Sequence, residues 1–198
     1  MSLVEPSDAE VAMARYVARR LSPGAWPLIE PYLDRTQEHE LHLMTCPDAP
    51  RPGQVTVSTL SLHRRRNLVD GEDVRVELVT TLRHPDVDLC SGLVVACAFT
   101  AVKERLPVRA GTVFPDVVGE LLDGRARHLL VTAPWSFPTL ARYPLSEGVE
   151  VRWLQAVPVH DGEREHAERS GADSLVELLH AAGADLADLD RDPVPLPA

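Results

Sequence analysis

The stretch "HDGEREH", residues 160–166, gathers histidines and carboxylates, the side chains that bind metal ions or transfer protons. A helix that begins near Asp161 turns by about 100° per residue, so His160 and His166 lie about 240° apart and point in different directions. Glu163 and His166 share a face, but two ligands make a poor metal site, and the zinc motif HExxH is absent. The spacing therefore argues against a metal site within this stretch.

The carboxylates of the same stretch have a structural explanation. We expect Asp161 to cap the helix and Glu163 and Glu165 to lie in its first turn, where the helix dipole favours each negative charge by about 0.3–1 kcal/mol. We therefore predict a charged helix start with no catalytic residue, no metal ligand and no cofactor. A role in contacting a partner remains open, and the candidate partner-binding residues are Asp161, Glu163, Glu165 and Glu168.

Other reactive residue types are scattered along the chain. His39 and His42 are three residues apart, but "LHLMTC" reads as a strand, which would turn them to opposite faces. Ser136 lacks the GxSxG setting of an exposed nucleophile, and no phosphate-binding glycine motif occurs. The alternative hypothesis is a small hydrolase or metal-dependent enzyme, which would need a pocket where at least two dispersed histidines meet a carboxylate. Those histidines are His39, His63, His84, His128 and His160.

The three cysteines form no recognisable redox or zinc motif. Cys90 and Cys97 fall in one expected helix, about 10 Å apart by its rise per residue. That separation exceeds the reach of a disulfide. With Cys46 they are predicted to be reduced, buried thiols without a chemical role, as in a reducing compartment.

Composition describes an ordinary globular protein. The chain has 198 residues, of which 44% are hydrophobic and 25% charged, enough for one domain with a substantial core. No apolar run approaches the roughly 20 residues that span a bilayer. The N-terminus lacks the basic, apolar and small-residue series of a secretory signal. We expect a cytoplasmic protein with no membrane partner.

The net charge of −10 is concentrated near the C-terminus. Between Val159 and Asp192 there are ten acidic residues against three arginines, a local balance of −7. Such a face repels the phosphates of nucleic acids and would steer a basic protein toward it. Simple solubility explains the charge equally well. The arginine run at residues 64–66 could grip phosphate, but we expect it to be solvated.

The elements that must position these residues alternate along the chain. "SDAEVAMARYVARRLS" carries the capping pair Ser7 and Glu10 and predicts an N-terminal helix ending at "SPG". "AWPLIEPYL" is broken by Pro27 and Pro31 and is expected to be irregular. "LHLMTC" predicts a strand. "QVTVSTLSLH" and "DVRVELVTTL" alternate like strands and predict an antiparallel pair, with an Asp70-Gly71 turn signal in their connection.

The second half adds a central helix, two strands and a terminal helix. "DVDLCSGLVVACAFTAVKERL" has a continuous apolar helical face, and "RHLLVTAPW" predicts a strand. "EVRWLQAVPV", apolar on both sides, predicts a strand buried within a sheet. "DSLVELLHAAG" predicts a short helix capped by Gly183. Together they indicate a single α+β domain, with a mixed or mainly antiparallel sheet covered by helices.

The C-terminal half resembles the suppressor of fused domain. The resemblance lies in the order of "VEVRWLQAVPV", the acidic "DGEREHAERSGADSLVELL" and "DLDRDPV". Upstream, "VTVSTLSLH", "VRVELVTTL", "RAGTVFPDVV" and "HLLVTAPW" are similar to earlier strands of that family. The resemblance predicts a helical extension at 1–36, a suppressor of fused-like domain at 37–194 and a tail at 195–198. The run "LSLHRRR" departs from the family's usual form, and the first 35 residues have no counterpart in it.

This resemblance implies an α+β interaction module that uses no cofactor. Animal members of the family restrain a transcription factor with a two-domain clamp, and this chain has the length of one such domain. Bacterial single-domain members are thought to act as immunity proteins. The leading hypothesis is therefore a non-enzymatic protein-binding module, an immunity protein whose partner is a basic toxin domain. A scaffold or self-associating protein is a further alternative, and the oligomeric state is left open.

Overall fold

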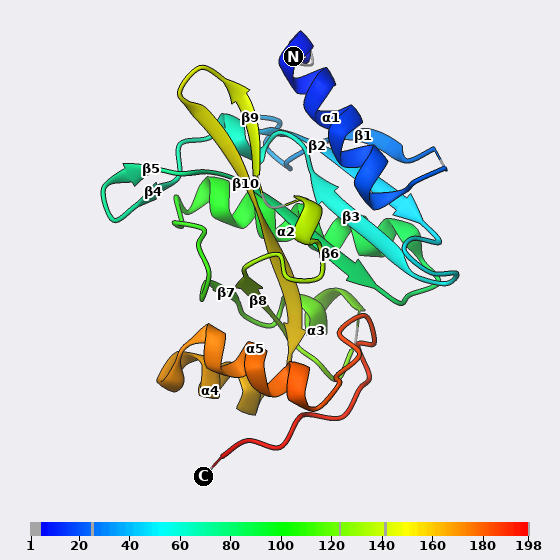
Figure 1. Ribbon diagram of the computed structural model, residues 1–198, viewed down its shortest axis with the longest axis vertical. Coiled ribbons are helices and arrows are strands. Elements are labelled where there is room, and N and C mark those ends of the chain that lie inside the picture. The colour runs from blue at the N-terminus through cyan, green and yellow to red at the C-terminus, as the bar shows by residue number, and fades with distance from the viewer. Residues whose placement is uncertain (1–4, 25, 123, 141, 198) are drawn as a thin grey trace.

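The computed structural model describes residues 5–24, 26–122, 124–140 and 142–197. Within them, helices cover both faces of one large sheet (Figure 1). The helices are α1 (Asp8–Leu21), α2 (Val87–Lys103), α3 (Val117–Leu122), α4 (Asp161–Ser170) and α5 (Ala172–Ala181), with single 3-10 turns η1 (Leu62–Arg64) and η2 (Pro138–Leu140). The strands are β1 (Leu28–Leu33), β2 (Glu40–Pro47), β3 (Val55–Thr59), β4 (Leu68–Val69), β5 (Glu72–Asp73), β6 (Arg75–Leu82), β7 (Val113–Phe114), β8 (His128–Thr132), β9 (Arg142–Ser146) and β10 (Val149–Val159).

The sheet is mixed but mainly antiparallel, which confirms the predicted α+β class. Its strand order is β1-β2-β3-β6-β10-β8-β7, and β9 pairs with the first half of β10. The β6–β10 pair is parallel, whereas the other strand pairs of the described chain are antiparallel. Strand β10 lies in the interior of the sheet, which explains why its sequence is apolar on both faces.

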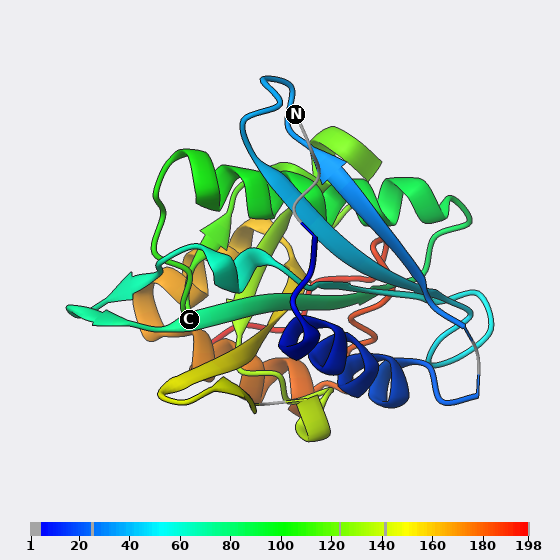
Figure 2. The same cartoon turned by 90° about the horizontal axis from the view of Figure 1, so that it is seen from above.

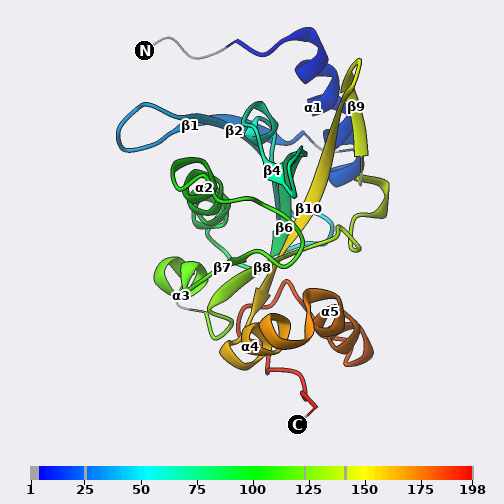
Figure 3. The ribbon, with the colours of Figure 1, turned by 90° about the vertical axis from the view of Figure 1, so that its left-hand side faces the viewer.

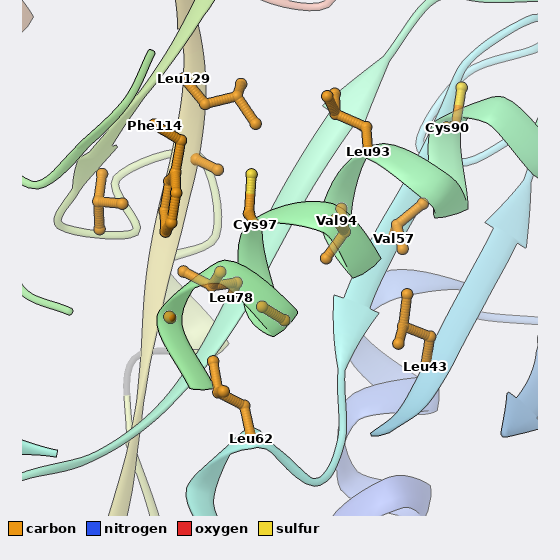
Figure 4. Packing of buried hydrophobic residues seen from close by; sticks show 14 of the residues in the cluster. Leu43, Val57, Leu62, Leu78, Cys90, Leu93, Val94, Cys97, Phe114 and Leu129 are labelled. Atoms are coloured by element: carbon orange, nitrogen blue, oxygen red, sulfur yellow. The ribbon is translucent and has the colours of Figure 1, made fainter. Parts of the chain in front are cut away.

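Helices lie on both sides of the sheet (Figures 2 and 3). The long helix α2 packs on one face, where Leu93 and Cys97 meet Val57 and Leu78 of the strands (Figure 4). The other face is covered in two halves. Helix α1 packs over Trp153, and α4 with α5 pack over the other end of β10. None of the described helices is long and apolar enough to cross a membrane.

Most of the predicted elements are confirmed. Helix α1 begins with the expected capping box, in which the Ser7 N–H donates to the Glu10 carboxylate at 2.8 Å. Strands β3 and β6 form the predicted antiparallel pair, and the Asp70-Gly71 turn joins the small β4–β5 hairpin between them. Gly183, just beyond α5, has a φ of 61°, the left-handed conformation that suits a glycine after a helix.

The prediction of an irregular segment at "AWPLIEPYL" is wrong, because residues 28–33 form the edge strand β1. The Asp34 N–H donates to the His39 carbonyl oxygen at 3.0 Å. Since N–H directions alternate along a strand, the Tyr32 N–H also points toward β2, and the backbone nitrogen of Pro31 points outward. A proline is tolerated there because its position needs no donor toward the sheet.

All three cysteines are free and buried, as predicted. Burial raises the pKa of Cys46 to about 11 and that of Cys90 to about 11. Burial raises the pKa of Cys97 as well. The thiols are therefore protonated at neutral pH and are not nucleophiles in this fold.

Candidate functional site

Helix α4 carries the acidic stretch that the sequence singled out. Its N-cap is His160, one residue before the Asp161 that was expected to cap it, and the helix ends at Gly171. Asp161, Glu165 and Glu168 are exposed on its outer side. The Glu168 carboxylate accepts a hydrogen bond from Arg164 at 2.7 Å, one helical turn away. These three carboxylates form the part of the predicted contact surface that a partner could reach.

Glu163 does not belong to that surface, which corrects the expectation from the sequence. Its side chain is completely buried on the inner face of α4. Both of its oxygens accept hydrogen bonds from the Arg191 guanidinium, at 2.7 and 2.6 Å. The N–H groups of His160 and Val194 donate to the same carboxylate at 3.0 and 2.9 Å. With its acceptor sites occupied, Glu163 anchors the C-terminal segment and cannot contact a partner.

The charge of Glu163 is stabilised in place. Burial alone would raise the pKa of its carboxyl, but the Arg191 hydrogen bonds and the two backbone donors outweigh burial and lower it. Arg191 also donates to the Pro158 carbonyl oxygen at 3.1 Å. The ion pair therefore ties the C-terminal segment to the end of β10 and to the start of α4.

Asp161 is exposed but engaged with a buried histidine. The Asp116 N–H donates to His128 Nδ1 at 2.8 Å, so that nitrogen is the acceptor. The other nitrogen, Nε2, then carries the hydrogen and donates to Asp161 at 2.7 Å. The hydrogen bond from His128 lowers the pKa of Asp161. Because both ring nitrogens are occupied, His128 has no free position to act as a general base.

His63 is enclosed in the same way at the other end of the molecule. Its Nδ1 faces the fully buried Glu77 carboxylate, and its Nε2 lies 3.4 Å from Glu10. Glu77 also accepts the backbone N–H groups of Leu62 and His63, at 3.2 and 3.1 Å. The His63–Glu77 contact is part of the framework that holds η1 and α1 against β6.

The dispersed histidines of the alternative hypothesis do not assemble into one site in the described part of the chain. His128 and His63 contact different carboxylates, and the His84 ring accepts the Asp86 N–H at 3.1 Å. Between described residues, no hydrogen bond or ion pair brings two of these five histidines to one carboxylate. Likewise, the described residues contain no group of three or more His, Cys, Asp or Glu side chains that could hold a metal ion.

A second surface feature was missed in the sequence. Trp26, next to the edge strand β1, is 96% exposed, and it borders a hollow of about 330 Å³ between α1 and β1. The hollow is lined mainly by apolar groups such as Val11 and Ile29. The prolines of "AWPLIEPYL" predicted an irregular segment, so no local signal indicated that Trp26 would lie beside a groove.

Fold and site together define an α+β domain with ionic anchors in its interior and an acidic outer helix. The family described as "Suppressor of fused protein (SUFU)" matches residues 37–192, and the chain belongs to this family. The resemblance seen in the sequence is thereby confirmed. Among curated proteins, it is 26% identical over 175 residues to "Immunity protein YqcF" of Bacillus subtilis, covering 86% of this chain and 90% of that protein.

Solved structures show the same fold. A SUFU homolog from Neisseria gonorrhoeae has a TM-score of 0.71 at 13% identity, covering 96% of this chain and 99% of that one. Drosophila Suppressor of Fused has a TM-score of 0.67 at 15% identity, covering 92% of this chain and 50% of that one. A chain of a Sufu–Fu complex has a TM-score of 0.65 at 17% identity, covering 95% and 91%.

Proposed function

We propose that this chain is a cytoplasmic immunity protein, a non-enzymatic domain that neutralises a toxin by binding it. The observation that carries the proposal is the similarity, over 86% of the chain, to a protein named as an immunity protein. Membership of the suppressor of fused family supports a binding role, since a related structure was solved as a complex with another protein. The occupied ring nitrogens of His63 and His128 are consistent with a structural role for these residues.

The contact surface proposed for the toxin is the outer side of α4, with Asp161, Glu165 and Glu168. The exposed carboxylates Asp173 and Glu177 of α5 extend the negative charge along the chain. The buried Glu163 and Arg191 pair fixes the start of α4, so the acidic side is presented on a rigid support. A basic toxin domain fits this surface, because complementary charge raises association rates by about 10- to 1,000-fold.

Co-expression with a toxin tests this function. The candidate toxin is the product of the neighbouring gene, expressed alone and together with this chain in a sensitive host. We expect growth to be rescued by co-expression and the two proteins to co-purify. If growth is not rescued and no complex forms, the proposed function is contradicted, whatever surface is used.

Charge reversal tests the α4 surface separately. Glu165→Lys with Glu168→Lys should slow association with the toxin by about tenfold at low salt, because it replaces attraction by repulsion. The difference should shrink as salt screens the charges. Stopped-flow or surface-binding kinetics would measure it.

The matched control is Glu38→Lys with Glu147→Lys, which makes the same change in net charge at exposed sites away from α4. Glu147 lies in the β9–β10 hairpin, at the opposite end of β10 from α4 (Figure 1). We expect a much smaller effect from this pair. Equal slowing by both pairs would show that overall charge, and not α4, governs the encounter.

A further inference from the structure

A hollow of about 490 Å³ lies between the β4–β5 hairpin and the segment that leaves α2. Leu68 of the hairpin and Leu106 of the segment are among its apolar lining residues, and Thr112 and Val113 lie farther along its wall. Figure 1 shows the hairpin and this segment on the same side of the molecule. Leu68 is 51% exposed, so the hairpin leaves apolar surface open to solvent.

Among the described residues, two arginines without a carboxylate partner adjoin Leu106, one of the residues that line this hollow. Arg65 Nη1 donates to the Leu106 carbonyl oxygen at 3.3 Å, and Arg105 directly precedes Leu106. Among the described residues, neither guanidinium has an ion pair. The flanking arginines do have one, since Arg64 pairs with Glu10 and Arg66 pairs with Asp73. Burial and the positive charge of Arg105 together lower the pKa of Arg65.

Arg105 also occupies a backbone conformation that favours glycine. Its φ is 53°, in the left-handed region, just after α2 ends. The Leu106 N–H donates to the Ala101 carbonyl oxygen at 3.1 Å, the closing bond typical of a helix end that uses glycine. An arginine at this position strains the backbone and adds a second positive charge beside Arg65.

We propose that this hollow is a docking site for an acidic, leucine-rich segment of a protein partner. An apolar side chain of the segment would fill the space between Leu68 and Leu106, and its carboxylates would meet Arg65 and Arg105. Arg109 lines the hollow, but its Nη1 already lies 3.5 Å from Asp70 Oδ1, so the two unpaired arginines beside Leu106 supply the attraction.

This site is separate from the acidic side of α4. The hairpin immediately precedes the start of β6, whereas α4 follows the end of β10. Because β6 and β10 are parallel, these two places lie at opposite ends of the strands. A partner with both a basic and an acidic surface could use the two sites together, and the docking site does not depend on the toxin proposal.

The direct test is a titration of ¹⁵N-labelled protein with a hexapeptide of alternating Glu and Leu residues, blocked at both ends. We expect saturable amide shifts at Leu68, Leu106 and Thr112, with binding in the range of about 1 mM or tighter. Hexapeptides of alternating Lys and Leu, and of alternating Glu and Ser, should leave these amides unshifted. They remove the acidic and the apolar component in turn.

Two variants separate loss of binding from loss of folding. Arg105→Gly should weaken the peptide about fivefold, since it removes one exposed ion pair of the complex. Its urea unfolding midpoint should equal or exceed that of the wild type, because glycine relieves the positive φ. Arg65→Ala should weaken the peptide similarly. Arg19→Ala removes an exposed positive charge from α1 and should leave binding unchanged.

Three results would overturn the proposal. One is an absence of saturable shifts at the hollow with the Glu and Leu peptide. Another is unchanged affinity in both Arg65→Ala and Arg105→Gly. The third is equal or tighter binding of the Lys and Leu peptide, or of a single-stranded oligonucleotide, at the same amides, since the occupant would then not be an acidic protein segment.

Discussion

At the scale of single residues, buried carboxylates connect distant parts of the chain. Glu163 and Arg191 are 28 residues apart, yet the guanidinium and carboxylate meet in a two-bond pair with almost no exposure. Such bidentate pairs fix both distance and orientation. The two residues come from "DGEREH" and "DLDRDPV", two of the segments that carried the family resemblance. In this chain, those segments supply the two halves of one anchor.

Removing one half of this anchor should be strongly destabilising. Glu163→Gln leaves the Arg191 charge buried without its anion, and we expect the free energy of unfolding to fall by about 3–5 kcal/mol. Urea denaturation followed by circular dichroism would measure the loss. Glu163→Leu combined with Arg191→Met is the matched control. This pair should recover much of the stability, because no buried charge is left unpaired. A loss below about 1 kcal/mol in Glu163→Gln would show that the pair is not an anchor.

At the scale of elements, the first turn of α1 is held to the sheet through a series of charged groups. The Glu10 carboxylate accepts hydrogen bonds from the Ser7 N–H at 2.8 Å and from Arg64 Nε at 2.6 Å. His63 lies between Glu10 and the buried Glu77 of β6. These contacts complement the apolar packing of α1 and fix where its N-terminus lies.

The attachment of α1 should weaken in acid. Burial alone would raise the pKa of Glu10, but Arg64 and Ser7 outweigh it and lower the pKa from 4.5 to about 2. The stabilisation from a depressed carboxyl pKa is complete above the unfolded value of 4.5 and is lost as the pH falls toward 2. Protection of α1 amides from hydrogen exchange, corrected for intrinsic rates, should therefore decline over this range.

The variant Glu10→Gln should reduce α1 protection near neutral pH and remove most of its pH dependence between 4.5 and 2. Asp8→Asn changes an exposed carboxylate in the same first turn and is the matched control. An equal effect of both substitutions would assign the pH dependence to the helix dipole and not to the contacts of Glu10.

Elements with strong local signals could be predicted from the sequence, whereas those defined by distant contacts could not. The capping box of α1, the long apolar face of α2 and the apolar run of β10 each carry their signal within one segment. Strand β1 was missed because Pro31 breaks local patterns. A proline is tolerated at this position because its backbone nitrogen faces outward at the sheet edge. The buried positions of Glu77 and Glu163 were missed for a related reason. A prediction from one segment alone places charged side chains in solvent, because their distant partners are not known.

At the scale of the whole molecule, the N-terminal segment is built into the same sheet as the rest of the chain. Strand β1 pairs along β2, and α1 buries Met13, Val17 and Leu21 against the face that includes Trp153. The family match begins at residue 37, while the likeness to the Neisseria gonorrhoeae structure covers 96% of the chain. The division at residue 36 remains a prediction, and the packing indicates that both sides of it depend on one core.

Deletion of residues 1–36 tests this dependence. Met13, Val17 and Leu21 are almost fully buried, and burial of three such side chains contributes about 5–9 kcal/mol. That is comparable to the whole stability of a typical domain, about 5–15 kcal/mol. The shortened protein should therefore lose cooperative unfolding, and its exposed apolar face should favour aggregation.

Deletion of residues 195–198, the predicted tail, is the control and should preserve a single unfolding transition. If residues 37–198 alone unfold cooperatively at the original midpoint, the first 36 residues are an extension of an independent domain, as the sequence had indicated.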